Sequence, residues 1–220
     1  ATRVFNGILA AKAPLRKLET LGVPVAVGMN GAALGGGYEI ALACHYRVAV
    51  ESAKMGLPEA QLGLMPGAGG VVRMVRIHGL TDAITYISQG KQFNGAQAVE
   101  KKFCHEVVAN EEDMHKKAKA WILANPEAKQ PWDTVGYKIP GGSPADKDMD
   151  QGLQGLLFFG PVNVMINTWN NFPAPKAIFA CVADVARVDF DTAEKIEARY
   201  FLSLMRSQVA KNMISTFFFQ

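Results

Sequence analysis

The stretch from residue 24 to residue 70 constrains the fold most, because it is almost free of charge. Its charged side chains are Glu39, Arg47, Glu51, Lys54 and Glu59. Short apolar runs, glycine turns and segments of helical character follow one another along it. This alternation of strand, glycine turn and helix predicts an α/β layer architecture with buried strands.

The spacing of apolar residues predicts where helices and strands lie. Residues 4–21 read as an amphipathic helix with a bend at Pro14. Two short apolar runs bounded by turn residues predict buried strands at 24–29 and 46–50. Further helices are expected at 38–44, 70–77, 81–89 and 95–101, with a loop at 63–70.

Composition divides the chain into three parts. Residues 1–124 form the α/β core, and residues 125–150, with four prolines and three glycines, are expected to be a loop without regular elements. The pattern is helical across 151–220. The segment from Asp191 to Phe218 opens with acidic residues and is expected to be the longest helix.

Overall composition excludes several classes of protein. With 49% hydrophobic and 20% charged residues, the chain is neither disordered nor a rod. It lacks an uncharged apolar run of about 18 residues, so no membrane-spanning helix is expected. A net charge of +3 is too small to indicate nucleic acid. Three widely spaced cysteines argue against a disulfide framework and for a reducing compartment.

Two acids in the charge-poor stretch sit beside glycine clusters. Glu39 follows Gly35-Gly36-Gly37-Tyr38, and Glu59 follows Gly56-Leu57-Pro58. Apolar surroundings raise the pKa of a carboxyl, because desolvation penalises its charged form. Two such groups can divide the work of general acid and general base. The alternative, two solvated acids on a loop and a helix, stays open on spacing alone.

The glycines ahead of Glu39 can form an anion-binding site. A helix that opens at Gly36-Gly37 leaves backbone N–H groups without intrahelical acceptors, and no Cβ hinders a ligand oxygen there. Such a site suits a developing oxyanion or a phosphate. Neither G-x-G-x-x-G nor G-x-x-x-x-G-K-[ST] occurs in the chain, which argues against dinucleotide and P-loop sites. Tight packing of helix on strand is the alternative explanation.

Other candidate residues are weaker. The histidines show no metal-ligand spacing, so no metal site is expected; they are His45, His78, His105 and His115. Cys104 and His105 are adjacent, so their side chains diverge in a strand and do not form a catalytic couple.

Two longer runs resemble the signatures of the crotonase, or enoyl-CoA hydratase, superfamily. The first runs from Pro24-Val25-Ala26-Val27 to Asn30-Gly31-Ala32-Ala33-Leu34-Gly35-Gly36-Gly37-Tyr38-Glu39. The second comprises Gly56-Leu57-Pro58-Glu59 and Leu62-Gly63-Leu64-Met65-Pro66-Gly67-Ala68-Gly69-Gly70. The resemblance is strong over residues 15–108. It implies an α/β fold of the crotonase type, a spiral of strand–strand–helix units with a helical C-terminal region.

Finer details are similar to the hydratase part of multifunctional fatty-acid oxidation enzymes of the alpha-subunit type. They are Ala43-Cys44-His45-Tyr46-Arg47-Val48-Ala49 and the stretch from Asp189 to Phe219. In that subfamily the hydratase leads into a 3-hydroxyacyl-CoA dehydrogenase domain, whose NAD would bind downstream of residue 220. The similarity implies a bacterial-type cytoplasmic protein, either a homo-oligomer (trimer or hexamer) or part of a fatty-acid oxidation complex with a thiolase subunit.

The family pattern implies a role for each matching residue. Gly36 would supply an oxyanion-hole N–H to the thioester carbonyl of a trans-2-enoyl-CoA. Both glutamates would hold the attacking water, with Glu59 exchanging the proton at Cα and Glu39 acting as base toward the water. Hydration needs no metal or nucleotide cofactor, because CoA enters as part of the substrate. The substrate pocket would be lined by Gly35, Leu57, Pro58 and, near the acyl head, Gly67.

The chain departs from the family at its start. The family normally carries an earlier segment with a Phe-x-Ala-Gly-x-Asp-like motif, which gives the second oxyanion N–H and much of the CoA pocket. That segment does not occur in this sequence, which also ends before any dehydrogenase motif. We therefore expect a chain cut at both ends, with Phe217-Phe218-Phe219 as an exposed apolar patch that meets a neighbour.

Two other functions remain open on the sequence. A Δ3-Δ2-enoyl-CoA isomerase would use Glu59 alone to move a proton between C2 and C4, so the additional presence of Glu39 favours hydration. The second is a catalytically silent assembly or RNA-binding module on the same fold, which the modest basic charge permits.

Overall fold

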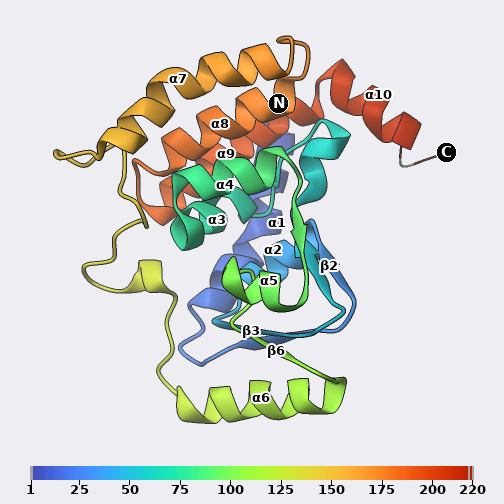
Figure 1. Ribbon diagram of the computed structural model, residues 1–220, viewed down its shortest axis with the longest axis vertical. Helices are drawn as coiled ribbons and strands as arrows, with labels where there is room; N and C mark the ends of the chain where they lie inside the picture. Colours follow the sequence, from blue (N-terminus) through green and yellow to red (C-terminus); the bar gives the residue numbers. More distant parts are fainter. Residues whose placement is uncertain (1, 218, 220) are drawn as a thin grey trace.

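The computed structural model describes residues 2–217 and 219 and has a mixed α/β architecture in which helices predominate (Figure 1). The first half contains α1 (Thr2–Glu19), β1 (Ala26–Met29), β2 (Ala32–Leu34), α2 (Gly36–Leu42), β3 (Tyr46–Val50), β4 (Lys54–Gly56), the 3-10 helix η1 (Pro58–Leu62), α3 (Gly70–His78), α4 (Leu80–Ser88), β5 (Gln92–Phe93), α5 (Gly95–Glu100), β6 (Glu106–Val108) and α6 (Glu111–Ala124). The second half contains η2 (Pro131–Asp133), α7 (Gln151–Asn167), α8 (Pro173–Val185), α9 (Phe190–Met205) and α10 (Gln208–Phe217).

Two small sheets take strands from successive turns of the chain. β1, β3 and β6 form a parallel sheet in which Ala26 pairs with Tyr46 and Val48 pairs with Glu106. In the second sheet β2 and β4 are parallel, and β5 pairs antiparallel with β4. The order β1, β2, α2 is thus repeated by β3, β4, η1 and α3. This repeat confirms the predicted stacking of strand–strand–helix turns.

β3 is the most deeply buried strand, and it lies where the sequence predicts it. All five of its residues are buried, because neighbouring strands flank it and α6 packs against it on one side (Figure 1). β1 begins two residues later than predicted, at Ala26. Pro24 has no N–H to donate to a ladder, and the carbonyl of Val25 instead accepts from the N–H of His45 at 2.9 Å.

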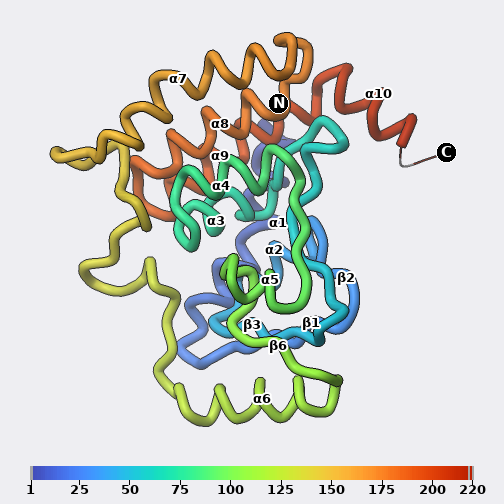
Figure 2. Tube along the Cα trace, in the orientation of Figure 1, coloured from blue at the N-terminus to red at the C-terminus, as the bar shows by residue number. Residues whose placement is uncertain are grey.

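The C-terminal helices form layers above the strand-rich part. α8 packs against α7 and α9 and against α3 and α4 beneath them (Figure 2). α1, at the other end of the chain, packs against α9. Residues from both ends of the chain therefore enclose α3, the helix that follows the second glycine cluster.

α7 leaves an apolar face uncovered. None of its residues is charged, and Phe158 and Ile166 are among its exposed side chains. Within the described part of the chain, no helix combines the length and apolar character needed to cross a bilayer.

The predicted single helix from Asp191 to Phe218 is wrong. α9 ends at Met205 and α10 begins at Gln208, and Phe218 itself lies outside the described residues. The Oγ of Ser207 accepts from Ala210 N at 3.1 Å, so this serine caps a new helix instead of continuing the old one. The start also differs, because the Asp189 carboxylate accepts from Thr192 N at 2.9 Å and α9 opens at Phe190. The longest helix described is α1, with 18 residues.

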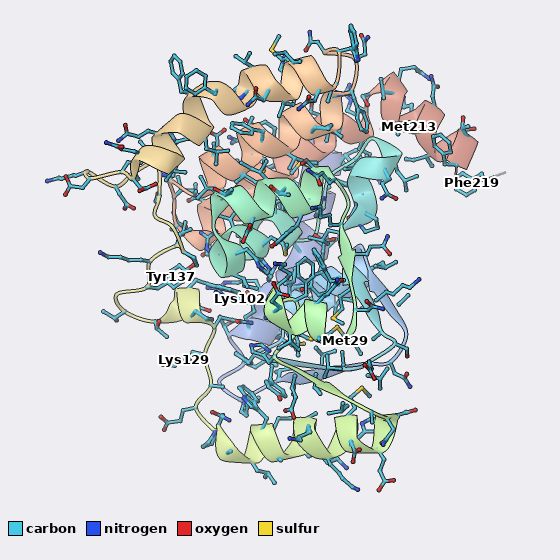
Figure 3. The ribbon with its side chains drawn as sticks, in the orientation of Figure 1. Met29, Lys102, Lys129, Tyr137, Met213 and Phe219 are labelled. Carbon is cyan, nitrogen blue, oxygen red and sulfur yellow. The ribbon has the colours of Figure 1, made fainter. Side chains whose placement is uncertain are left out.

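The segment 125–150 contains one short regular element, η2, where the sequence predicts none. It runs along the side of the molecule, where Figure 3 marks it at Lys129 and Tyr137. Polar contacts tie it to the core: the Tyr137 hydroxyl donates to the carbonyl of Arg76 at 2.6 Å, and Arg16 pairs with Asp133 at 2.6 Å.

Candidate active site

The first glycine cluster forms a turn that joins β2 to α2. Gly35 has φ 56° and ψ −130°, a conformation that glycine adopts without a steric penalty. Its N–H donates to the carbonyl of Gly56 at 3.0 Å, which fixes the turn to β4. Gly36 is the first residue of α2, so its N–H has no intrahelical acceptor. The sequence prediction of an open helix N-terminus here is confirmed.

A cleft of about 810 Å³ lies over this turn. Four residues that the sequence singles out contribute to its wall, namely Gly35, Gly36, Pro58 and Glu59. The remaining wall consists of Leu34, Gln61, Leu62, Gln92 and Phe217.

Glu59 is the acid that lines the cleft. It follows Pro58 in the first turn of η1, and a Cβ built on Gly35 would lie only 3.4 Å from its Oε1. Its Oε2 is buried and has no hydrogen-bond partner among the described residues. Burial, followed by the negative charge of Glu197, raises the pKa of Glu59 to about 7. A carboxyl with this pKa can both give and take a proton near neutral pH.

Glu39 is buried beneath the cleft and is not among the residues that line it. Only 3% of Glu39 is exposed, and its Oε1 accepts from the N–H groups of Ala68 and Gly70, each at 2.7 Å. Burial raises its pKa to about 8, with further contributions from the negative charges of Glu197 and Glu59. The two backbone donors lower the pKa but do not offset these effects. Because both acids titrate near neutral pH, the pair of Glu39 and Glu59 can hold one proton there, on either carboxyl.

The other two predicted pocket residues lie away from the open cleft. Leu57 is buried and precedes η1. Gly67 lies against Phe201 of α9, where an added Cβ would be 2.7 Å from the aromatic ring. The cleft wall instead includes Phe217, whose side chain is 69% exposed. Phe219 is also exposed, and Figure 3 shows it at the end of α10, near Met213.

The sequence analysis missed a buried ionic network behind Glu39. The Glu197 carboxylate accepts from Lys12 Nζ at 2.7 Å, from Gly69 N at 2.7 Å and from Val72 N at 3.1 Å. Arg73 continues the network by pairing with Glu19 at 2.8 Å and with Glu194 at 3.3 Å. One signal was available: Glu194 and Glu197 lie on the same stripe of their helix as the small residues Ala193 and Ala198, which a buried helix face requires.

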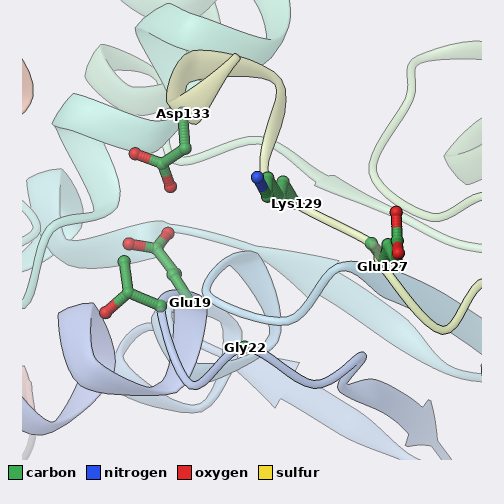
Figure 4. Close-up of a pocket in the computed structure, with 7 residues that line it drawn as sticks. Glu19, Gly22, Glu127, Lys129 and Asp133 are labelled. Atoms are coloured by element: carbon green, nitrogen blue, oxygen red, sulfur yellow. The ribbon is translucent and has the colours of Figure 1, made fainter.

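A second hollow, of about 530 Å³, lies beside this network (Figure 4). Glu19 and Gly22 lie on one side of it, with Lys129 and Asp133 on the other. It contains none of the predicted site residues, and ion pairs with Arg16 engage both Glu19 and Asp133. Among the described residues, no group of three or more His, Cys, Asp or Glu side chains could hold a metal ion.

Comparison with known proteins identifies a matching family and relatives of similar sequence. The profile of the family described as enoyl-CoA hydratase/isomerase matches residues 9–129. The fatty acid oxidation complex subunit alpha of Shewanella loihica is 34% identical over 205 residues, which cover 91% of this chain and 28% of that protein. The subunit of the same name from Pseudomonas savastanoi pv. phaseolicola is 34% identical over 213 residues, covering 96% of this chain and 29% of that protein. The chain thus spans less than a third of these relatives.

Solved structures resemble the fold over most of this chain. An enoyl-CoA hydratase from Mycobacterium avium subsp. paratuberculosis has a TM-score of 0.63 at 21% identity, over 96% of this chain and 68% of that one. An enoyl-CoA hydratase from Bacillus anthracis has a TM-score of 0.51 at 24% identity, over 94% of this chain and 64% of that one. These likenesses confirm the fold that the sequence motifs imply.

Proposed function

Because this chain belongs to the enoyl-CoA hydratase/isomerase family, we propose that it adds water to a trans-2-enoyl-CoA and forms a 3-hydroxyacyl-CoA. One observation carries the proposal: the Glu59 carboxyl lines a cleft beside Gly36, with a buried oxygen that has no partner among the described residues. An unpaired buried oxygen costs free energy. A water molecule held against the substrate double bond would satisfy it.

The mechanism follows from where charge and protons move. The water oxygen forms a bond to C3 while its proton passes to the carboxylate of Glu39. The electrons of the C2–C3 double bond shift toward the thioester oxygen as an enolate, and the Glu59 carboxyl gives its proton to C2. The Gly36 N–H faces the developing oxyanion, and one such donor is typically worth about 3 kcal/mol. Gly35 and Pro58 would line the pocket around the reacting thioester, and Leu57 and Gly67 would support its wall from behind.

Hydration transfers protons but no electrons, so the proposed reaction requires neither NAD nor a metal. The CoA moiety enters with the substrate. NAD would serve the dehydrogenase step that uses the 3-hydroxyacyl product, in a domain downstream of this chain.

The assembly and its location are further proposals. The two relatives named above are subunits of a fatty acid oxidation complex, which supports a multifunctional enzyme that pairs with a thiolase subunit or forms a trimer or hexamer. Three free, buried cysteines, Cys44, Cys104 and Cys181, suit a reducing bacterial cytoplasm. Light scattering at micromolar concentration tests the homo-oligomer, because a monomer would contradict it.

The decisive experiment follows loss of the enoyl-thioester absorbance of crotonyl-CoA. The chain is assayed alone and with the family's Phe-x-Ala-Gly-x-Asp-like segment placed before it. We expect hydration that falls at least about 100-fold in Glu59→Gln, because the acid is lost. Glu100→Gln is the matched control, since that glutamate is exposed on α5 and, within the described part of the chain, forms an ion pair with Lys101 alone. Absence of hydratase activity both in the chain alone and in the extended chain, or full activity of Glu59→Gln, would overturn the proposal.

The isomerase alternative is less favoured, because isomerisation requires one acid and a second, Glu39, lies beneath the cleft that Glu59 lines. Glu39→Gln separates the two reactions. We expect it to lower hydration about 100-fold, because the base toward water is lost, while isomerisation of a 3-enoyl-CoA through Glu59 partly survives. Parallel assays of both substrates check this, and equal loss of both reactions would contradict the division of roles.

A further inference from the structure

The N-terminus of α3 is shared by two carboxylates from distant parts of the chain. Ala68 N and Gly70 N donate to Glu39 Oε1, whereas Gly69 N and Val72 N donate to Glu197. Glu197 lies on α9, 128 residues beyond Gly69. The backbone between residues 68 and 72 is therefore held from two sides.

We propose that Glu197 is the positioning residue for Glu39: it fixes the start of α3 so that the N–H groups of Ala68 and Gly70 point at the Glu39 carboxyl. The inference rests on the proposed function for the part that Glu39 plays. It adds that the chemistry depends on a side chain of the C-terminal helices that does not line the cleft.

The geometry leaves Glu197 little freedom. Its side chain is fully buried, and Lys12 Nζ from α1 holds the same Oε1 that accepts from Gly69. Lys12 is itself 1% exposed and is anchored by a second hydrogen bond, to the carbonyl of Glu194 at 2.8 Å. A carboxylate tied to α1, α3 and α9 can hold a loop in place, because moving it breaks several charge-assisted hydrogen bonds at once.

The loop that Glu197 holds also has little space. A Cβ on Gly70 would lie 2.7 Å from Glu39 Oε1, and one on Gly69 would lie 1.8 Å from Arg73 Nη1. The backbone can approach both carboxylates only because these positions are glycines. A small displacement of the loop would therefore change the hydrogen bonds to Glu39 directly.

Charge gives Glu197 a second effect on the site. Its negative charge raises the pKa of Glu39 and of Glu59, after burial itself. The charged groups that act on Glu39 are Glu197 on α9 and Glu59 on η1. Lys12 on α1, Arg73 on α3 and Glu194 on α9 belong to the network that surrounds Glu197. Neutralising Glu197 leaves Lys12 without its closest partner, and both changes favour the ionised form of Glu39.

The test compares two glutamates of the same helix. Glu197→Gln removes the charge that contacts the α3 backbone. Glu194→Gln is the matched control, because Glu194 belongs to the same network, through Arg73 and Lys12, and its carboxylate lies beside Gly69. Unlike Glu197, it accepts none of the hydrogen bonds that the N–H groups of Ala68, Gly69, Gly70 and Val72 donate. Each variant is assayed for kcat and KM across pH, and the Glu39 carboxyl is titrated by carbon NMR in the substrate-free protein.

We expect Glu197→Gln to lower kcat about 10- to 100-fold with little change in KM, because the base is misplaced. Two effects of this substitution act on the Glu39 pKa in opposite directions: loss of the Glu197 charge lowers it, and displacement of the two N–H donors raises it. Glu194→Gln keeps the pH profile. A kcat equal to that of Glu194→Gln overturns the proposal.

Two features keep the test decisive. Glu197→Asp separates the two effects on the pKa, because it retains the charge but withdraws it by one methylene. In this variant we expect a lower kcat and a Glu39 that titrates above its position in the unaltered chain, because the N–H donors are displaced while the negative charge stays. An unchanged Glu39 titration or an unchanged kcat overturns the proposal. The titration needs no substrate, so it reports on Glu197 even if the chain does not hydrate enoyl thioesters. Failure of the proposed function and failure of this inference are thereby distinguishable.

Discussion

At the scale of single residues, two glutamates with similar surroundings in the sequence have different surroundings in the structure. Glu59 lines the cleft with an oxygen that has no partner, whereas Glu39 is buried and held by two backbone donors. Burial raises the pKa of both above that of an ordinary glutamate. Desolvation, which the apolar, glycine-rich sequence predicts, is thus the leading cause of both raised pKa values in the folded protein.

The two pKa values predict a narrow pH optimum. With the pKa of Glu59 at about 7 and that of Glu39 at about 8, both carboxyls are protonated at low pH and no base remains. Both are ionised at high pH, and no acid remains. We therefore expect kcat/KM for crotonyl-CoA to peak between these values and to fall about tenfold per pH unit on either side. A profile that stays flat from pH 6 to pH 9 would contradict this assignment.

Gly70 provides a second test at this scale. In Gly70→Ala the new methyl would lie 2.7 Å from Glu39 Oε1 and from Pro66 Cβ, so the carboxyl or the loop must move. We expect kcat to fall about 10- to 100-fold, measured with crotonyl-CoA. Gly155→Ala on α7 is the control, because no atom lies within 4 Å of its added Cβ, and it should retain full activity. Equal activity of the two variants would refute the close packing of Glu39 on Gly70.

Glu197 could not have been identified as a partner of the site from the sequence, for a physical reason. Its hydrogen bonds join residues 128 and 185 positions apart, and neither spacing nor periodicity encodes such contacts. The positions of Glu39 and Glu59 were predictable because glycines with special backbone requirements lie next to them. The stripe of Ala193, Glu194, Glu197 and Ala198 indicates a buried helix face, but it does not indicate which residues the two glutamates contact.

At the scale of elements, strong local patterns gave correct predictions, whereas very short elements were not predicted. β3 and the helix after Gly69 lie where the apolar pattern predicts them. β2, β4 and β6 have three residues each and β5 has two, which is too short for an alternation to show. The break between α9 and α10 was missed because one serine causes it.

That break determines where α10 lies, and so it brings Phe217 to the cleft. α10 packs against η1, where a Cβ on Gly63 would lie 3.1 Å from Ala210 Cα. Phe217 then lies on the cleft wall with Leu62 and Pro58. These apolar side chains are suited to an acyl chain.

Phe217→Ala should therefore affect long substrates more than short ones. We expect KM for a 2-decenoyl-CoA to rise about 3- to 10-fold as apolar contact area is lost, with kcat for crotonyl-CoA unchanged. Phe158→Ala is the control, because Phe158 is similarly exposed but lies on α7. The comparison is made by steady-state kinetics on both substrates. An equal change of KM for both chain lengths would argue against an acyl contact.

At the scale of the whole molecule, one ionic network connects the two ends of the chain. Lys12 on α1 and Glu197 on α9 pair at 2.7 Å with almost no solvent contact. Removal of one partner leaves a buried, uncompensated charge, which is more damaging than removal of both. The α1–α9 contact therefore contributes to stability as well as to the site.

Lys12→Met tests this contribution. We expect the free energy of unfolding to fall by about 3–5 kcal/mol, measured by urea titration. Lys116→Met serves as the control, because its pair with Glu112 on α6 is exposed and should contribute little. Equal stability of the two variants would show that the buried pair does not hold α1 and α9 together.

The same pair has a consequence for the growing chain on the ribosome. Lys12 is synthesised 185 residues before the carboxylate that neutralises it. At translation rates of about 5–20 residues per second, its partner emerges roughly 10 to 40 s later. During that interval α1 cannot occupy its final place without burying a lone cation. α1 is thus among the last of these helices to dock, and a nascent protein must keep it hydrated until α9 has left the exit tunnel.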